Sequence, residues 1–591
     1  TYLTQGLLLG VVALGVGVAV AGGLALALVR FLVPLSASVR ATLTPTYLAR
    51  ALSPRDALIP AAIGAGLGLL ALLVASWQAA RLDALAYRRE QGRGDRAPFW
   101  RRYYLDLGLV VLCGAAYLEL ATFGGLGVRA QLNSLAGTPG SGASAVDYVQ
   151  VAAPTLLLLA GALLLQRALP WALRGLAWLA GRLRGATATL ALAQAARAGA
   201  TFGRLTLLLT LAVGLGLYAL SFQTTLQQGA HDNAAYLTGA DERVVIEPES
   251  MGTPTTTGFT AAFAKMPGVV SVSPLYRGTA LTLANQGGQN VDVLGVDPAS
   301  FAQTTAATWR SDYASQSLPQ LMRILQQAKH GPDAGTSAQP LVALIDQTYA
   351  NAFQLSVGQT FQLAPQEAGQ ASTASSVKFV VGAIVTAFPT LYDEYAGGYL
   401  VVDVTDYLAA LGNPDLAAYA ENGPNEFLLR TTADPRAARA RAQALTDPNY
   451  FVQQTLDART LTAQYQADPL QAGMSGLLLL GALLAALLAL VGTLTQAGVA
   501  ARARQTQFAI LRTLGLGAGQ LVAALTLEQA VIYLLGTLGG LGIGALLAYG
   551  SLPFLGFTTA SYTPPVVGVP SSLLAVNVPA SLVYLGGLLM V

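Results

Sequence analysis

Apolar residues in this chain gather into long runs, which are separated by short polar connections and by one long polar segment. A helix that crosses a bilayer needs about 20 successive apolar residues, and most of the runs reach that length. The pattern therefore predicts a polytopic α-helical membrane protein. The predicted spans are residues 5–30, 57–79, 103–123, 148–167, 203–222, 473–498, 519–549 and 579–591, the last of them incomplete.

Residues 223–472 have a pattern that is typical of a folded polar domain. Short alternating or β-branched stretches such as "ERVVIEP", "VDVLGVD", "QPLVALID" and "VKFVVGAIV" predict strands. The stretches "SQSLPQLMRILQQA" and "DPRAARARAQAL" predict helices between them. The segment is therefore predicted to be an α+β domain. Its polar ends, residues 223–240 and 456–472, are expected to continue the adjacent spans as helical stalks.

Composition supports a membrane protein and excludes several other classes. Of the 591 residues, 53% are hydrophobic and 11% are charged, against about 25% charged residues in soluble domains. The net charge of +3 is too small to indicate a nucleic-acid partner. Cys113 is the single cysteine, so neither an internal disulfide nor a thiolate zinc site can form. The two histidines, His231 and His330, are expected at the surface.

The distribution of arginine predicts the orientation in the membrane. The connections 80–102, 167–204 and 499–518 are rich in arginine, so the positive-inside rule places them in the cytoplasm. The connections 124–147 and 551–578 carry almost no positive charge and are expected outside. The alternation closes if the chain begins inside, and it then places the polar domain outside. The connection 31–56 carries three arginines although the alternation places it outside, which is a mild departure from the rule.

A long glycine-rich span, a proline-containing loop and a further span occur twice, in residues 1–79 and 519–591. We interpret the two segments as copies of one permease unit. The spans 103–123 and 148–167 lie between the copies as an extra pair. Both ends of the sequence fall within apolar runs, so the natural protein is expected to be longer.

The last third of the chain carries a family signature. The stretch "ARARQTQFAILRTLGLGAGQLVAALTLEQAVIYLLGTLGGLGIG" resembles the signature of FtsX-like (MacB/Lol-type, type VII) ABC transporter permeases. The polar domain is similar to the MacB-like periplasmic core domain in "MPGVVSVSPLY", "VDVLGVDPASF", "LIDQTYANAFQLSVGQTFQL" and "VKFVVGAIVTAFP". The order of span, outside domain and three spans fits residues 203–591, whereas residues 91–200 carry little of the likeness.

The resemblance implies a location in the bacterial cytoplasmic (inner) membrane and a separate cytoplasmic ABC ATPase, a dimer, as the partner that binds ATP and magnesium. This chain lacks Gly-x-x-x-x-Gly-Lys-Ser/Thr, so it is expected to hold no cofactor and to be no enzyme. The implied domains are 1–90, the C-terminal part of a first FtsX-like repeat; 91–202, a linker region with two extra transmembrane helices and a cytoplasmic amphipathic segment; 203–222, the first span of the second repeat; 223–472, the extracytoplasmic core with its stalks; and 473–591, the FtsX-like permease domain.

The segment that precedes span 519–549 is the candidate coupling element. Phe508, Leu511 and Leu514 recur at helical spacing and form an apolar stripe. Such a stripe suits helix-in-groove docking, while an interfacial helix on lipid headgroups is the alternative. In the resembled family this knuckle docks on the ATPase. The residues assigned to it are Arg504, Gln507, Phe508, Ala509, Leu511, Arg512 and Gly515, with Gln507 at a position where the family usually has an acidic residue.

Two features lie within span 519–549 itself. Glu528 is about ten residues, or about 15 Å, into the span, where a carboxylate must pair, become protonated or face the bundle interior. We expect a structural role with a hydrogen-bonded partner rather than proton coupling. Gly536, Gly540 and Gly544 form a small-xxx-small ridge, which indicates close helix packing or, equally, a hinge.

The polar domain shows no Gly-x-Ser-x-Gly and no His-Glu-x-x-His, so we expect no catalytic site in it. Asp292, Asp297 and Asp346 are placed at strand ends, where turn or capping roles are usual.

The predicted function is that of a permease that transmits ATPase motion to the outside domain, for export or extraction of a lipid, lipoprotein or peptide. The expected contacts are the lipid bilayer and an extracytoplasmic substrate or accessory protein. One alternative is a membrane scaffold that activates an extracellular cell-wall hydrolase without transport. Another is an ion-coupled carrier, which needs several buried charges, whereas only Glu528 qualifies.

Overall fold

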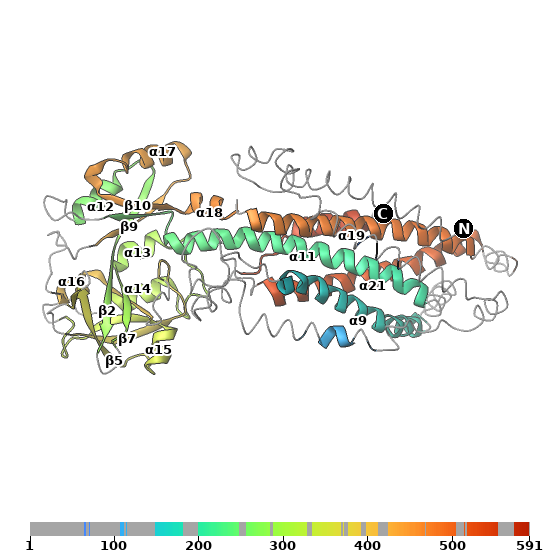
Figure 1. Ribbon diagram of the computed structural model, residues 1–591, viewed down its shortest axis with the longest axis horizontal. Coiled ribbons are helices and arrows are strands. Elements are labelled where there is room, and N and C mark those ends of the chain that lie inside the picture. The colour runs from blue at the N-terminus through green and yellow to red at the C-terminus, as the bar shows by residue number, and fades with distance from the viewer. Residues whose placement is uncertain are drawn as a thin grey trace. The chain divides into compact units, whose positions relative to one another are not determined.

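The structure is a computed structural model in which the chain divides into two compact units (Figure 1). We call residues 1–227, 466–557 and 573–591 the helical unit, and residues 228–465 with 558–572 the α+β unit. The residues that the structure describes are 148–180, 199–246, 256–283, 288–327, 334–367, 370–371, 376–391, 398–411, 424–466, 469–503, 517–552 and 573–589, with Thr513 and isolated residues between 64 and 182.

Long apolar runs become helices in the helical unit, because a helix satisfies its own backbone groups where no water can do so. Its helices are α9 (Tyr148–Ala180), the first part of α11 (Gly199–Thr238), α19 (Pro469–Ala503), α21 (Ala518–Ser551) and α22 (Val578–Leu589). The stretches that are long and apolar enough to cross a membrane are Leu156–Trp178, Gly203–Thr238, Gly473–Gln496 and Gly519–Ser551, and α22 contributes the shorter apolar run Val578–Leu588.

Four predicted spans coincide with these apolar helices, namely 148–167, 203–222, 473–498 and 519–549. The first of them ends later than predicted, because α9 continues past Arg167 and Arg174 to Ala180. Arginine is a good helix former and its long side chain can extend toward water, so it does not end a helix. Apart from isolated residues, the predicted spans before residue 148, and the repeat that they suggest, lie outside the described residues.

The two predicted stalks differ in the structure. Helix α11 runs without a break through residues 223–238. Residues 456–472 are not one helix, because strand β10 (Val452–Asp457) takes their start before α18 (Ala458–Gln466) begins. Pairing of β10 with β1 (Glu242–Ile246) overrides the local helical preference.

The helices of the helical unit alternate in direction. Helices α11 and α21 run parallel, since Leu205 packs against Ile532 and, farther along both helices, Tyr218 lies beside Ser551. Helices α9, α19 and α22 run the opposite way, which agrees with the alternation expected from the arginines. The neighbours that show it are Leu158 with Gly214 and Gln166 with Gly203 for α9, Leu215 with Gly481 and Leu208 with Gly492 for α19, and Thr224 with Ala575 and Ala212 with Tyr584 for α22.

The α+β unit is built on one ten-stranded sheet with the order β10-β1-β9-β2-β3-β8-β4-β7-β5-β6. Its strands, besides β1 and β10, are β2 (Val269–Thr282), β3 (Asn290–Val296), β4 (Leu341–Asp346), β5 (Thr360–Glu367), β6 (Gln370–Ala371), β7 (Val377–Val385), β8 (Tyr399–Asp403) and β9 (Glu426–Thr431). Its helices include α12 (Thr256–Ala264), α13 (Pro298–Thr304), α14 (Leu318–Gln326), α15 (Gln347–Ala352), α16 (Val404–Ala410) and α17 (Pro435–Ala444).

Part of this sheet closes on itself. The second half of β2 pairs with β3 on one side and with β5 on the other, so β2, β3, β8, β4, β7 and β5 form a ring. The strands read as nearly continuous apolar runs because side chains on both faces are buried, one set inside the ring and another under α13 and α14. Strands β10, β1 and β9 extend from β2 as a lobe that α12 covers, with Phe259, Phe263 and Phe427 in its core.

The predicted α+β class is confirmed, with differences in detail. Strand β2 continues without a break from Val269 to Thr282. Asp297 and Asp346 cap α13 and α15 as expected, each accepting backbone N–H groups of the first helical turn. Asp292 was wrongly placed at a strand end, since it lies inside β3 opposite Thr279.

Candidate functional site

Helix α21 packs against α11 through its row of glycines. A Cβ atom added at Gly536 or Gly540 would lie 2.8 or 2.7 Å from side-chain atoms of α11. At Gly544 the neighbour is the α11 backbone itself, with the carbonyl oxygen of Gly214 at 2.9 Å. The Thr210 hydroxyl donates to the carbonyl oxygen of Gly536 over 3.2 Å. The three glycines therefore lie where only a missing side chain allows the two backbones to approach.

The adjacent face of α21 fits against α9 by the same means. A Cβ atom at Gly161 of α9 would lie 2.7 Å from Ile543, and one at Gly539 of α21 would collide with Leu165. Helix α21 thus packs against both α9 and α11.

Glu528 lies on the face of α21 that turns toward α11. It is one helical turn before Ile532, which packs against Leu205, so Glu528 is level with the start of the apolar stretch of α11. Glu528 is 1% exposed and has an interaction partner.

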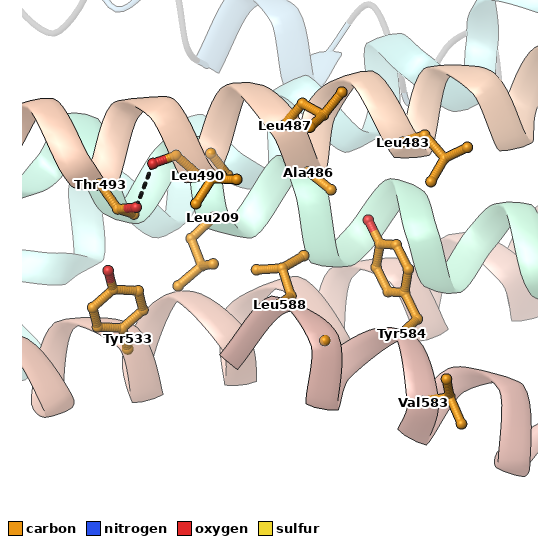
Figure 2. A pocket seen from close by; sticks show the side chains of 12 residues that line it. Leu209, Leu483, Ala486, Leu487, Leu490, Thr493, Tyr533, Val583, Tyr584 and Leu588 are labelled. Atoms are coloured by element: carbon orange, nitrogen blue, oxygen red, sulfur yellow. Dashed lines mark hydrogen bonds between the residues drawn. The ribbon is translucent and has the colours of Figure 1, made fainter. Parts of the chain in front are cut away.

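An apolar cavity of about 280 Å³ opens between α11, α19, α21 and α22 (Figure 2). Tyr533 and Tyr584 enter it from α21 and α22 (Figure 2). The other polar side chain in the lining is Thr493, whose hydroxyl donates to Leu490 O over 2.6 Å. The lining is Leu209, Leu483, Ala486, Leu487, Ala489, Leu490, Thr493, Tyr533, Val583, Tyr584, Gly587 and Leu588.

Tyr584 joins three helices beside this cavity. Its hydroxyl lies 2.9 Å from the carbonyl oxygen of Ala212 in α11 and 3.2 Å from that of Ala482 in α19. The ring occupies the space that a side chain at position 216 would need, so Gly216 makes the contact possible. Sequence reasoning missed this residue, because a tyrosine in an apolar run carries no spacing that identifies its partners.

The last turns of α11 are held tightly within the α+β unit. Asp232 pairs with Arg310 at 3.4 Å, and the hydroxyl of buried Tyr236 donates to Leu391 O over 2.7 Å. The backbone N–H of Thr390 donates back to the carbonyl oxygen of Tyr236 over 2.8 Å. One helix therefore belongs to the helical unit at its start and to the α+β unit at its end.

A buried charge cluster lies nearby in the sheet. Glu426 of β9 accepts from Arg243 at 2.6 Å and from Arg277 at 2.8 Å, and Arg243 also donates to the carbonyl oxygen of Leu237 in α11 over 3.2 Å. Burial pushes the pKa of Glu426 upward, but the two arginines outweigh burial and lower that pKa to about 2. The cluster therefore stays charged at neutral pH.

The candidate knuckle residues Arg504, Gln507, Phe508, Ala509, Leu511, Arg512 and Gly515 lie outside the described residues. Among the residues that the structure does describe, no group of three or more His, Cys, Asp or Glu side chains could hold a metal ion. His231 is exposed on α11, as expected.

Comparisons with known proteins found one family model and several solved structures. The family model of the FtsX-like permease C-terminal domain matches residues 479–591. The extracellular domain of the noncanonic ABC-type transporter YknZ from Gram-positive bacteria is 10% identical with a TM-score of 0.22, over 36% of this chain and 96% of that one. The periplasmic region of MacB from Actinobacillus actinomycetemcomitans is 10% identical with a TM-score of 0.22, over 38% and 93%. None of the curated proteins matches the chain. Helices α21 and α22 and most of α19, which help to line the cavity, thus lie in residues 479–591, the stretch that matches the FtsX-like permease C-terminal domain.

Proposed function

We propose that this chain is the permease subunit of an ABC transporter, and that a separate cytoplasmic ATPase, a dimer, binds ATP and magnesium and drives it. The chain transmits the motion of the ATPase to its α+β unit by mechanotransmission. The FtsX-like domain at residues 479–591 supports this class.

The observation that carries the coupling is the continuity of α11. Near its start this helix packs on α21 through Gly536, Gly540 and Gly544. At its end, Asp232 and Tyr236 fix it in the α+β unit. Under this proposal α21 and α11 move together, and their displacement passes along α11 into the α+β unit.

The arginines support a location in a bacterial inner membrane in which the α+β unit lies on the side opposite the cytoplasm. The helix directions bring the end of α9, the start of α11, the end of α19 and the start of α21 to one side. The connections on that side, residues 167–204 and 499–518, contain arginines and no acidic residue. The α+β unit is connected at the other ends of α11 and α19.

The apolar cavity supports a substrate with an acyl chain or another apolar part. A cavity of about 280 Å³ lined by leucine and alanine side chains excludes strongly hydrated molecules. Export or extraction of a lipid, lipoprotein or lipophilic peptide fits this lining better than activation of a hydrolase, which needs no apolar site among the membrane helices.

Co-purification tests the coupling to an ATPase. Deletion of residues 504–515, or Phe508→Asp, is expected to abolish co-purification of a P-loop ATPase from the native host, because either change removes the apolar stripe. Val270→Asp places the same charge at an exposed valine of β2 and is expected to leave the complex intact. An ATPase that still binds the deletion variant would contradict the proposal.

A second arm tests transmission separately from ATPase binding. Insertion of Gly-Ser-Gly after Gln227 interrupts α11 between its two anchored parts. The complex should still assemble and hydrolyse ATP, while substrate release stops. Gln227→Ala keeps the helix continuous and should retain release.

A further inference from the structure

The second half of α9 presents an aromatic and basic stripe away from its neighbours. Trp171, Arg174 and Trp178 recur three and four residues apart, so they share one face of the helix. Trp171 is 74% exposed and Trp178 is 62% exposed. The buried Leu169 and Leu173 pack against Val531 and Leu535 of α21.

Arg182 extends the stripe by one more turn. The central carbon of its guanidinium group lies 3.7 Å from the ring centroid of Trp178, in a cation–π contact. This contact orders an arginine that follows the helix and keeps its charge beside an exposed indole. We call Trp171, Arg174, Trp178 and Arg182 the α9 stripe.

The positive charge of the stripe has no counterion within the described part of the protein. Residues 148–204 contain no aspartate or glutamate. Among the described residues, neither Arg174 nor Arg182 pairs with a carboxylate. Both arginines are exposed and are therefore accessible to a negative group of another molecule.

The level of the stripe along the helices identifies that molecule. Leu173 packs at Val531, next to Ile532, which itself packs on Leu205 at the start of the apolar stretch of α11. Trp171 and Arg174 thus lie in the last two turns of the apolar stretch of α9, which ends at Trp178, and Arg182 follows the end of the helix. Tryptophan and arginine at this level meet lipid headgroups.

We propose that the α9 stripe is a binding surface for an anionic phospholipid. The guanidinium groups of Arg174 and Arg182 bind the phosphate and the negative headgroup, and the indoles of Trp171 and Trp178 lie beside the glycerol and upper acyl chains. The charge of the stripe selects anionic over zwitterionic lipids. The surface lies outside residues 479–591, so it does not depend on the proposed transport function.

Native mass spectrometry of the full chain tests this surface. The protein is exchanged from detergent into mixtures of phosphatidylglycerol and phosphatidylcholine, and the retained lipids are counted. Because each arginine near a membrane surface contributes about 1 kcal/mol, Arg174→Gln with Arg182→Gln should lower the preference for phosphatidylglycerol roughly 30-fold. Arg174→Lys with Arg182→Lys should keep most of the preference. Free glycerol phosphate should not displace the lipid.

Arg436→Gln with Arg439→Gln is the matched control, because it removes the same charge from exposed positions of α17 in the α+β unit. This control should keep the full preference. An unchanged preference in the α9 double variant would overturn the proposal, as would equal losses of both lipids or an equal loss in the α17 control. Trp178→Leu should weaken retention of both lipids without changing the ratio, and an altered ratio would contradict the assigned division of roles.

Discussion

At the scale of single residues, the contact between α11 and α21 depends on side chains that are absent. Gly540 has its nearest α11 atoms within 3 Å of the position that a Cβ would take, one of them the backbone oxygen of Thr210. A backbone atom cannot move away as the end of a long side chain can, so the helices would have to separate.

Gly540→Ala is therefore expected to destabilise the protein by about 1–3 kcal/mol, the usual effect of an overpacked contact. The measurement is thermal unfolding of the full chain in detergent. Gly542→Ala is the control on the same helix, because nothing lies within 4 Å of its added Cβ. That variant should be neutral or up to about 1 kcal/mol more stable, since alanine favours a helix. Equal effects at both positions would argue against the glycine ridge.

Glu426 carries the second prediction at this scale. Glu426→Gln leaves the buried Arg243 and the partly buried Arg277 around an uncharged group, which should destabilise the α+β unit by about 3 kcal/mol at neutral pH. Hydrogen exchange of the β9 amides in the full chain measures the effect. Arg323→Gln on the exposed face of α14 is the control and should change little.

The pH dependence of that variant has a definite sign. The pKa of Glu426 is lowered from its ordinary value of 4.5 to about 2. The ionised group therefore stabilises the fold fully above pH 4.5, and this contribution, about 3 kcal/mol, is lost as the pH falls toward 2. Burial raises the pKa of both Glu242 and Asp346, so these two groups make the fold more stable as the pH falls. They do so equally in the wild type and in Glu426→Gln. The difference between wild type and Glu426→Gln should thus shrink on acidification, and a constant difference would refute the assignment.

At the scale of elements, the cavity is formed only where α11, α19, α21 and α22 meet (Figure 2). Ala486 of α19 lines it, whereas Leu488 of the same helix is 62% exposed and does not. A large side chain at Ala486 would fill the cavity, whereas the same side chain at Leu488 would only enlarge the outer surface of α19.

Ala486→Trp is expected to abolish most cross-linking of a lipid that carries a photoreactive acyl chain, because the indole fills the space that the chain would enter. Leu488→Trp should leave cross-linking unchanged. Cross-linking of purified full-length protein in detergent, followed by mass spectrometry of the modified peptide, provides the comparison. A normal yield from Ala486→Trp would show that the apolar substrate does not bind there.

At the scale of the whole molecule, the orientation in the membrane can be tested with the single native cysteine removed. In a Cys113→Ala background, Ala433→Cys lies on the exposed surface of the α+β unit and Val499→Cys lies on an exposed face near the end of α19. A membrane-impermeant maleimide should label Ala433→Cys in intact spheroplasts and Val499→Cys only after permeabilisation. The reverse pattern would place the α+β unit in the cytosol and contradict the transporter proposal.

The sequence by itself determined the elements and the class. Four spans and most strands were predictable because the length of an apolar run and the alternation of side chains are local properties. Aspartates at strand ends identified the caps of α13 and α15 for the same reason. Strand β10 was missed because its residues acquire strand structure from β1, far away in the sequence.

The tertiary structure alone decided which faces meet. A row of glycines such as Gly536, Gly540 and Gly544 indicates close packing, but only the packed helices show that α11 is the neighbour. Contacts between distant segments likewise close β2 on β5 and join Tyr584 to two other helices. The contact of Ile532 with Leu205 shows which part of α11 lies beside Glu528. The physical reason is that hydrophobic pattern and propensity are properties of residues close together in the sequence. Packing and burial depend on residues that are far apart in the sequence and meet only in the folded protein.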